Sequence, residues 1–133
     1  MTITWEYLLN FDYNNPFPNE RTDEMLEEYS KWQIYLKENN IDINEYLFNT
    51  YLKNNDYCIE ANRFPYNTPE NIFHYVLWIN PKYKINLTNK NILEIVINKM
   101  NEMKCSGYIC FENHVSVRSV LGIPHYQVFF RKC

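Results

Sequence analysis

The sequence predicts one α+β domain in which N-terminal helices and one crossover helix pack on a small mixed β-sheet. Three observations support this fold class. The length of 133 residues fits a single domain, and the 46 % hydrophobic content is enough for one core. Apolar residues recur at helical spacing in some segments, while other short runs are rich in β-branched and aromatic residues. No internal repeat or interdomain linker interrupts residues 1–133, which we assign to one domain.

The first half of the chain is predicted to be mainly helical. Residues 1–20 contain an aromatic anchoring element that ends in a turn. Thr22 is suited to cap the first long helix, and acids follow in its first turn. Asp42 and Glu45 form a capping-box-like start to a second helix, which ends near Asn54. The apolar stripe of the first long helix is assigned to the core and comprises Met25, Tyr29, Trp32 and Leu36.

The second half alternates strands with one helix. A short strand at 57–60 and a buried strand at 73–79 precede a helix over 88–103. Strands at 107–112 and 125–131 follow. If 73–79 and 107–112 are parallel members of one sheet, the helix must cross over it right-handedly, and 125–131 can return antiparallel beside 107–112.

Charge and cysteine content exclude several classes of protein. The net charge of −3 and the absence of a Lys/Arg cluster argue against a nucleic-acid binder held by phosphate contacts. No apolar run approaches the ~18 residues of a membrane span, and the N-terminus lacks signal-peptide features, so we expect a cytoplasmic or nuclear protein. Without a Cys-x-x-Cys pair, the cysteines are expected to be buried or idle thiols; they are Cys58, Cys105, Cys110 and Cys133. The single alanine and the abundance of Asn, Ile, Lys and Tyr are typical of AT-rich genomes, such as those of protists or large DNA viruses.

The last strand carries the clearest functional pattern. Alternation places His125, Gln127, Phe129 and Arg131 on one face, which is mostly polar. This pattern is typical of a ligand-facing surface, and also of an ordinary solvated sheet face. His74 lies on the other strong strand, where the register decides whether it shares the face of His125 or is a core histidine.

Several motifs, in this order and spacing, resemble the fungal N-acetylglucosamine-induced proteins, a family that carries a domain of unknown function. The motifs are Asp56-Tyr-Cys-Ile-Glu-Ala-Asn-Arg-Phe-Pro-Tyr66, His74-Tyr-Val-Leu-Trp78, Leu87-Thr88, Phe111-Glu-Asn113, Arg118-Ser-Val and Pro124-His-Tyr-Gln-Val128. The resemblance covers roughly 22–131 and implies an intracellular protein linked to amino-sugar metabolism, without an established reaction. The chain departs from the family where it has Arg63 instead of an acid and Gln127 instead of a second histidine.

The candidate site is a pole formed by strand ends and loops. His125 is the candidate general acid or base, and Glu112 its partner carboxylate. Loop arginines can bind phosphate or carboxylate with two parallel hydrogen bonds. The candidate ligand-binding residues are Asn62, Arg63, Asn113, Arg118, Ser119 and Gln127.

Two function classes remain open at this point. The first is binding of a compact anionic metabolite, such as a phosphorylated sugar or nucleotide, with hydrolysis or group transfer as the possible reaction. The second is a non-catalytic module that docks a protein partner through some of its twelve tyrosines and eight phenylalanines. Convergence of His125, Arg118 and Arg63 on one concavity would favour the first. We predict no metal, because no His-x-x-x-His spacing occurs, and no cofactor, because no Gly-rich phosphate loop occurs.

Overall fold

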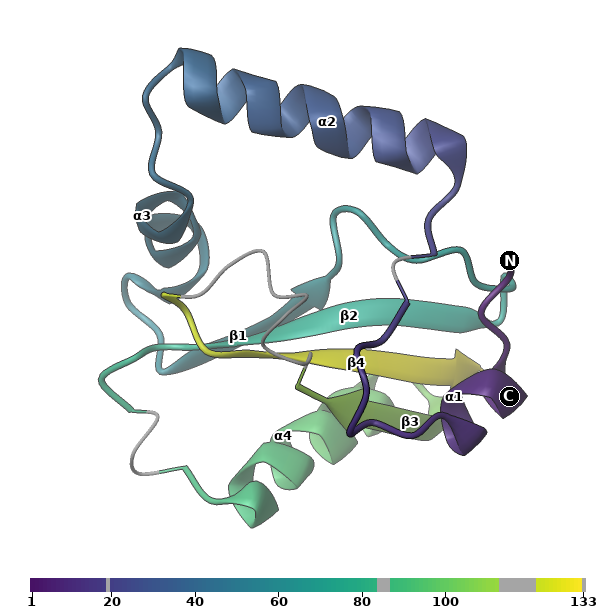
Figure 1. Cartoon of the computed structure of the whole chain (residues 1–133). Helices are drawn as coiled ribbons and strands as arrows, with labels where there is room; N and C mark the ends of the chain where they lie inside the picture. Colours follow the sequence, from purple (N-terminus) through teal and green to yellow (C-terminus); the bar gives the residue numbers. More distant parts are fainter. Residues whose placement is uncertain (19, 84–86, 113–121, 133) are drawn as a thin grey trace.

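The computed structural model describes residues 1–18, 20–83, 87–112 and 122–132. Helices and strands alternate along the chain much as the sequence indicates (Figure 1). No helix in the described ranges combines the length and apolar content that a membrane crossing requires. The elements are α1 (Trp5–Asn10), α2 (Asp23–Glu38), α3 (Ile43–Leu47) with a π-helical turn η1 (Phe48–Leu52), β1 (Tyr57–Ala61), β2 (Ile72–Ile79), α4 (Asn89–Glu102), β3 (Cys105–Phe111) and β4 (His125–Lys132).

The strands form one sheet in the order β1-β2-β4-β3, so the α+β class is confirmed. The sequence predicts a mixed sheet, but every neighbouring pair in the structure is antiparallel. β2 and β3 do run in the same direction, yet β4 lies between them rather than only beside β3. The central place of β4 follows from its composition, because Val128, Phe129 and Phe130 are fully buried on both faces of the sheet.

α4 covers one face of the sheet. Thr88 caps this helix by a reciprocal capping box with Asn91. Ile92 and Val96 are buried against residues of β2, β3 and β4. These sheet residues are Leu77, Ile79, Cys105, Val128 and Phe130.

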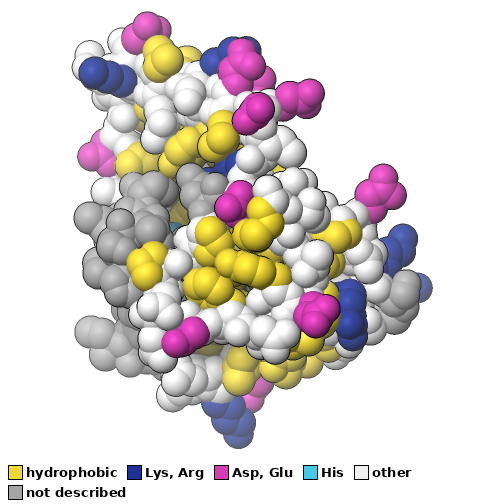
Figure 2. All heavy atoms as spheres, turned by 45° about the vertical axis from the view of Figure 1, so that its right-hand side comes forward, with side chains coloured by type: hydrophobic (Ala, Val, Ile, Leu, Met, Phe, Trp, Pro, Cys, Tyr) yellow, Lys and Arg dark blue, Asp and Glu magenta, His cyan; other side chains and the backbone are white. Residues whose placement is uncertain are grey.

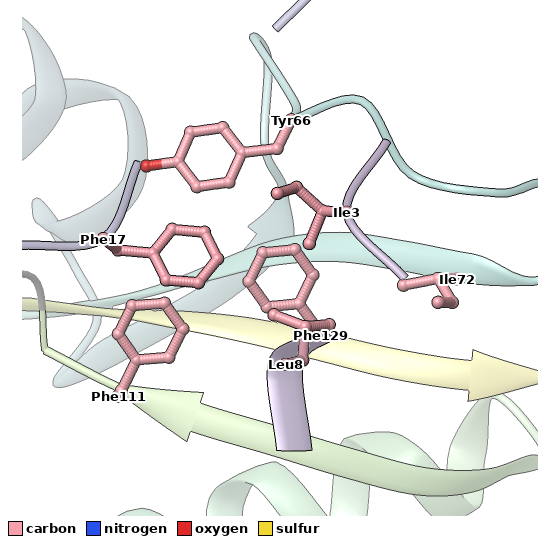
Figure 3. Packing of buried hydrophobic residues seen from close by; sticks show 7 residues of the cluster. All are labelled: Ile3, Leu8, Phe17, Tyr66, Ile72, Phe111 and Phe129. Carbon is pink, nitrogen blue, oxygen red and sulfur yellow. The ribbon is translucent and has the colours of Figure 1, made fainter. Parts of the chain in front are cut away.

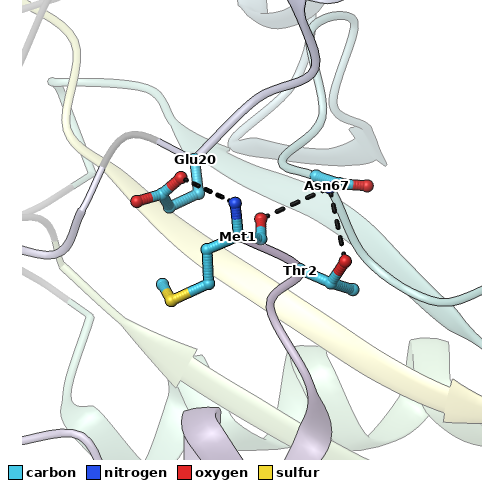
Figure 4. A network of polar contacts seen from close by, with 4 residues as sticks. All are labelled: Met1, Thr2, Glu20 and Asn67. Atoms are coloured by element: carbon cyan, nitrogen blue, oxygen red, sulfur yellow. Dashed lines mark hydrogen bonds and ion pairs between the residues drawn. The ribbon is translucent and has the colours of Figure 1, made fainter.

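The N-terminal segment covers one half of the opposite face. Figure 3 shows an aromatic and aliphatic cluster in which the side chains of this segment meet those of the strands; its members are Ile3, Leu8, Phe17, Tyr66, Ile72, Phe111 and Phe129. Polar contacts anchor the chain terminus to Glu20, which precedes α2, and to Asn67 in the loop between β1 and β2 (Figure 4). The Met1 amino group lies 3.6 Å from the Glu20 carboxylate, and the Asn67 amide nitrogen lies 3.3 Å from the Met1 carbonyl and 3.5 Å from the Thr2 hydroxyl.

α3 and η1 cover the other half of this face, where Leu47, Leu52 and Ile123 form a small cluster against Trp78. α2 lies above the sheet between these two halves (Figure 1). The assignment of its whole apolar stripe to the core is wrong, since only Leu36 is buried. The other members of the stripe, Met25, Tyr29 and Trp32, are only partly buried because the space beneath α2 is not filled by protein.

Candidate ligand-binding cavity

A cavity of about 640 Å³ lies between α2 and the uncovered part of the sheet. Its floor comes from β2 and β4, where the register sets Val76 beside Gln127 and Trp78 beside His125. In Figure 2 acidic side chains project from the outer surface of the upper lobe, over α2, and hydrophobic side chains gather along its lower edge. The remaining walls come mainly from α2, α3 and the β1–β2 loop, and include Tyr29, Trp32, Leu36, Tyr46, Asn62, Arg63, Phe64 and Tyr66.

Among the described residues, the charged side chains that line the cavity are all basic. They are Arg21, Lys37 and Arg63, and no described Asp or Glu lines the cavity. The whole chain has 16 acids against 13 basic residues, so this distribution is opposite in sign to the net charge. Because the walls are partly apolar, the field of these cations is less screened than at an open surface. The cavity is therefore electrostatically suited to an anion.

Arg63 is held by aromatic stacking rather than by an acid. Its guanidinium carbon lies 4.1 Å from the centroid of the Trp32 ring and 5.5 Å from that of Phe64. Among the described residues it forms no ion pair with a carboxylate. Stacking orients the planar donor group and leaves its N–H edge for another acceptor.

Arg21 is the more deeply placed of the two arginines. Its Nε donates to the Phe64 carbonyl at 2.6 Å, and its guanidinium carbon lies 4.7 Å from the centroid of the Tyr66 ring. Burial lowers the pKa of the Arg21 guanidinium, and the nearby tyrosines oppose this shift. An arginine remains protonated despite such a shift. Arg21 thus places a positive charge at the inner wall.

His74 lies beneath the cavity floor and is bonded on both sides. The Tyr66 backbone N–H donates to Nδ1 at 3.0 Å, and Nε2 lies 2.5 Å from the Gln127 Oε1. Its ring also stacks on Phe129. Burial, with a smaller contribution from the Arg21 charge, lowers its pKa to about 3 despite the bond to Gln127. His74 is therefore neutral near pH 7 and is a satisfied core histidine on the same face as His125.

His125 sits at the start of β4 and lines the cavity. Its Nδ1 lies 2.9 Å from the Ile123 carbonyl, which can only accept, so Nδ1 carries the proton. In the neutral ring the lone pair is then on Nε2. The ring centroid lies 5.0 Å from that of Trp78. This arrangement fixes the tautomer of the neutral ring, in which Nε2 is the basic nitrogen.

The structure brings together only part of the predicted site. Asn62, Arg63, His125 and Gln127 all line the cavity. Glu112 is exposed and does not line the cavity. It lies near Cys110, on the α4 side of the sheet. Burial raises the pKa of the Cys110 thiol to about 12, and the Glu112 charge adds to this effect. The remaining predicted residues lie outside the described residues; they are Asn113, Arg118 and Ser119.

Sequence reasoning missed two of the three cations that the described residues contribute to the cavity lining. Arg21 lies just before the N-cap of α2, and Lys37 lies in the last turn of this helix. A lysine in the last turn ordinarily interacts favourably with the negative end of the helix dipole. Nothing in their local sequence indicates a common cavity. Arg131, in contrast, faces the far end of the sheet and lies 4.9 Å from the centroid of the Trp5 ring.

Comparisons with known proteins identify the family. One solved structure is similar to this chain and is described as "Crystal Structure of HTC1". The match covers 86 % of this chain and 77 % of the chain in that structure, with a TM-score of 0.61 and 19 % sequence identity. At this identity, the similarity shows a shared fold alone. No match is found among the curated proteins. The family described as "Protein of unknown function (DUF3605)" matches residues 5–131, almost the whole chain. The chain therefore belongs to the DUF3605 family.

Proposed function

We propose that the protein binds a compact anionic metabolite in the cavity between α2 and the sheet. The observation that carries this proposal is that Lys37 and Arg63 line the cavity without an ion pair to a described carboxylate, in a chain of net charge −3. A cavity that is lined by one sign of charge and has partly apolar walls attracts ions of the opposite sign. We therefore infer that the ligand is an anion.

The size and lining of the cavity favour a phosphorylated sugar or a nucleotide. Its volume of about 640 Å³ falls within the range of about 300–1,000 Å³ that is usual for small-molecule sites. Aromatic side chains such as Tyr46 of the wall and Trp78 of the floor can stack on a sugar or base, and the amides of the lining can bind its polar atoms. The resemblance to the fungal N-acetylglucosamine-induced proteins points the same way, towards an intracellular protein and a sugar-derived ligand. On the same grounds, Asn113, Arg118 and Ser119 remain proposed ligand-binding residues.

Catalysis of hydrolysis or group transfer is a further step of this proposal. His125 would be the acid or base, since it lines the cavity and has a defined tautomer. Arg63 would stabilise charge on the reacting anion. The partner carboxylate proposed from the sequence, Glu112, would have to act from outside the described lining.

The alternative function is docking of a protein partner through exposed aromatic side chains. Partial exposure of Tyr35 and Tyr57 is compatible with it. The shared cavity of Arg63 and His125 instead favours the ligand, because dispersed polar residues would be expected around a flat docking patch.

A thermal-shift screen of nucleotides, sugar phosphates and nucleotide sugars tests the proposal. At least one compound should raise the melting temperature, and the increase should shrink as NaCl is raised, because salt screens the attraction between the anion and the cations. The unphosphorylated sugars and nucleosides serve as matched controls. A screen in which these neutral compounds stabilise the protein as well as their phosphates would refute an anion site.

A further inference from the structure

Gln127 has an unsatisfied donor at the floor of the cavity. Its side chain is only 6 % exposed, and it lines the cavity from the central strand β4. Its Oε1 is bonded to His74, but its amide nitrogen has no acceptor within the described part of the chain. Buried amide groups are nearly always paired, so this one calls for an acceptor from outside the protein.

The orientation of this amide follows from a chain of hydrogen bonds. A backbone N–H can only donate, so the Tyr66 N–H makes Nδ1 of His74 the acceptor and leaves the ring proton on Nε2. That proton needs an acceptor, which is the Gln127 Oε1 at 2.5 Å. The Gln127 NH2 group must then point away from His74.

Asn62 supports the same orientation. The Phe64 N–H donates to its Oδ1 at 2.8 Å, which turns its Nδ2 towards His74, 3.3 Å from Nε2. Asn62 Nδ2 and the protonated Nε2 of His74 are therefore neighbouring donors, and the Gln127 oxygen is the acceptor for Nε2. Turning the Gln127 amide around would place three donors together with no acceptor between them.

We propose that the Gln127 amide, fixed by His74 as a positioning residue, donates to an oxygen of the ligand at the inner end of the cavity. The ligand is then polar at both ends. Its anionic group lies near Arg63 and Lys37, which are exposed side chains of the lining, and an oxygen-rich group reaches the buried floor. This inference rests on the proposed function and adds one requirement to its ligand, an oxygen acceptor at the end away from the anionic group, which excludes anions with an apolar tail.

The affinities of glucose 6-phosphate, AMP and hexyl phosphate, measured by calorimetry, test this choice. The three compounds carry a phosphate, but hexyl phosphate has no oxygen at its other end. We expect glucose 6-phosphate or AMP to bind at least ~10-fold more tightly than hexyl phosphate. In Gln127→Leu this preference should fall by about tenfold, while the affinity for hexyl phosphate should change less than about twofold.

The outcomes separate the two proposals. If hexyl phosphate binds as tightly as the other two compounds, the role of Gln127 is overturned and the anion site stands. If none of the three binds at millimolar concentration, the anion site itself is refuted. Should Gln127→Leu not fold, the wild-type protein still gives an answer, because the side-chain NH2 signals of Gln127 should shift in an NMR titration with the tighter compound and not with hexyl phosphate.

The positioning role of His74 has its own spectroscopic test. Long-range proton–nitrogen NMR spectra at pH 7 should show a neutral ring protonated at Nε2, as the Tyr66 bond requires. A ring protonated at Nδ1 would turn the Gln127 oxygen towards the cavity and would overturn the proposal. A merely space-filling role for His74 would not fix the tautomer.

Discussion

Lowering the pH from 7 to 5 should destabilise the protein through His74. Its pKa is about 3 in the folded state, lowered by burial, against 6.5 in the unfolded chain. The unfolded state therefore takes up a proton on His74 in this range and the folded state does not, so stability falls as the pH falls. When the pH falls from 7 to 5, the unfolded state binds this proton with a pKa of 6.5 and the folded state does not. The free energy of unfolding therefore falls by about 2 kcal/mol.

Urea unfolding at a series of pH values measures this loss. His74→Phe keeps an aromatic ring next to Phe129, but this ring cannot titrate. Between pH 7 and 5, the free energy of unfolding of this variant should therefore change by about 2 kcal/mol less than that of the wild type, whatever the stability of the variant at pH 7. The matched control is the double variant His114→Gln with His125→Gln, which removes the other two imidazoles and should retain the wild-type dependence on His74. Equal pH dependence in the wild type and His74→Phe would refute the buried neutral histidine.

Three further predictions concern packing and the thiols. Ile92→Ala should lower the free energy of unfolding by about 2–5 kcal/mol, because the side chain is buried in the α4 cluster, and a denaturation midpoint equal to that of the wild type would contradict this packing. Trp32→Ala should cost less than Ile92→Ala, since this ring is only partly buried and borders the cavity; a larger loss would mean that α2 packs as core. Cys58 and Cys110 should be alkylated by iodoacetamide at pH 7 far more slowly in the native than in the unfolded protein. The reason is that burial, as the largest cause, raises the pKa of Cys58 to about 11 and that of Cys110 to about 12. Equal alkylation rates in the two states, measured by mass spectrometry, would exclude this protection.

Local chemistry made much of the fold predictable. Thr22, Asp42 and Thr88 each accept a hydrogen bond from a backbone N–H in the first turn of the helix that follows, as their residue types indicate. The alternation of β4 is also confirmed, with His125 and Gln127 on one face and Val128 between the sheet and α4. These features depend on neighbours within a few residues.

Long-range packing was not predictable from the same patterns. The apolar stripe that contains Tyr29 and Trp32 has the same sequence pattern whether protein atoms or a cavity lie beneath the helix. Strand order depends on which strand can be buried on both faces, and β4 takes the centre although it follows β3 in the chain. The convergence of Arg21 with Arg63 is a result of this tertiary arrangement, because the residues are far apart in the sequence.

The affinity of the tightest phosphorylated compound for Arg63→Ala and Lys90→Ala, measured by calorimetry at low salt, tests the central claim most directly. Arg63 stacks on Trp32 at the cavity wall, whereas Lys90 is exposed on α4, on the opposite face of the sheet, so the two variants remove the same charge from different places. Loss of a charge-assisted hydrogen bond of about 1.5–3 kcal/mol should weaken binding about ten- to a hundredfold in Arg63→Ala and leave Lys90→Ala within about twofold of the wild type. Equal affinities of the two variants would show that the anion does not bind between α2 and the sheet.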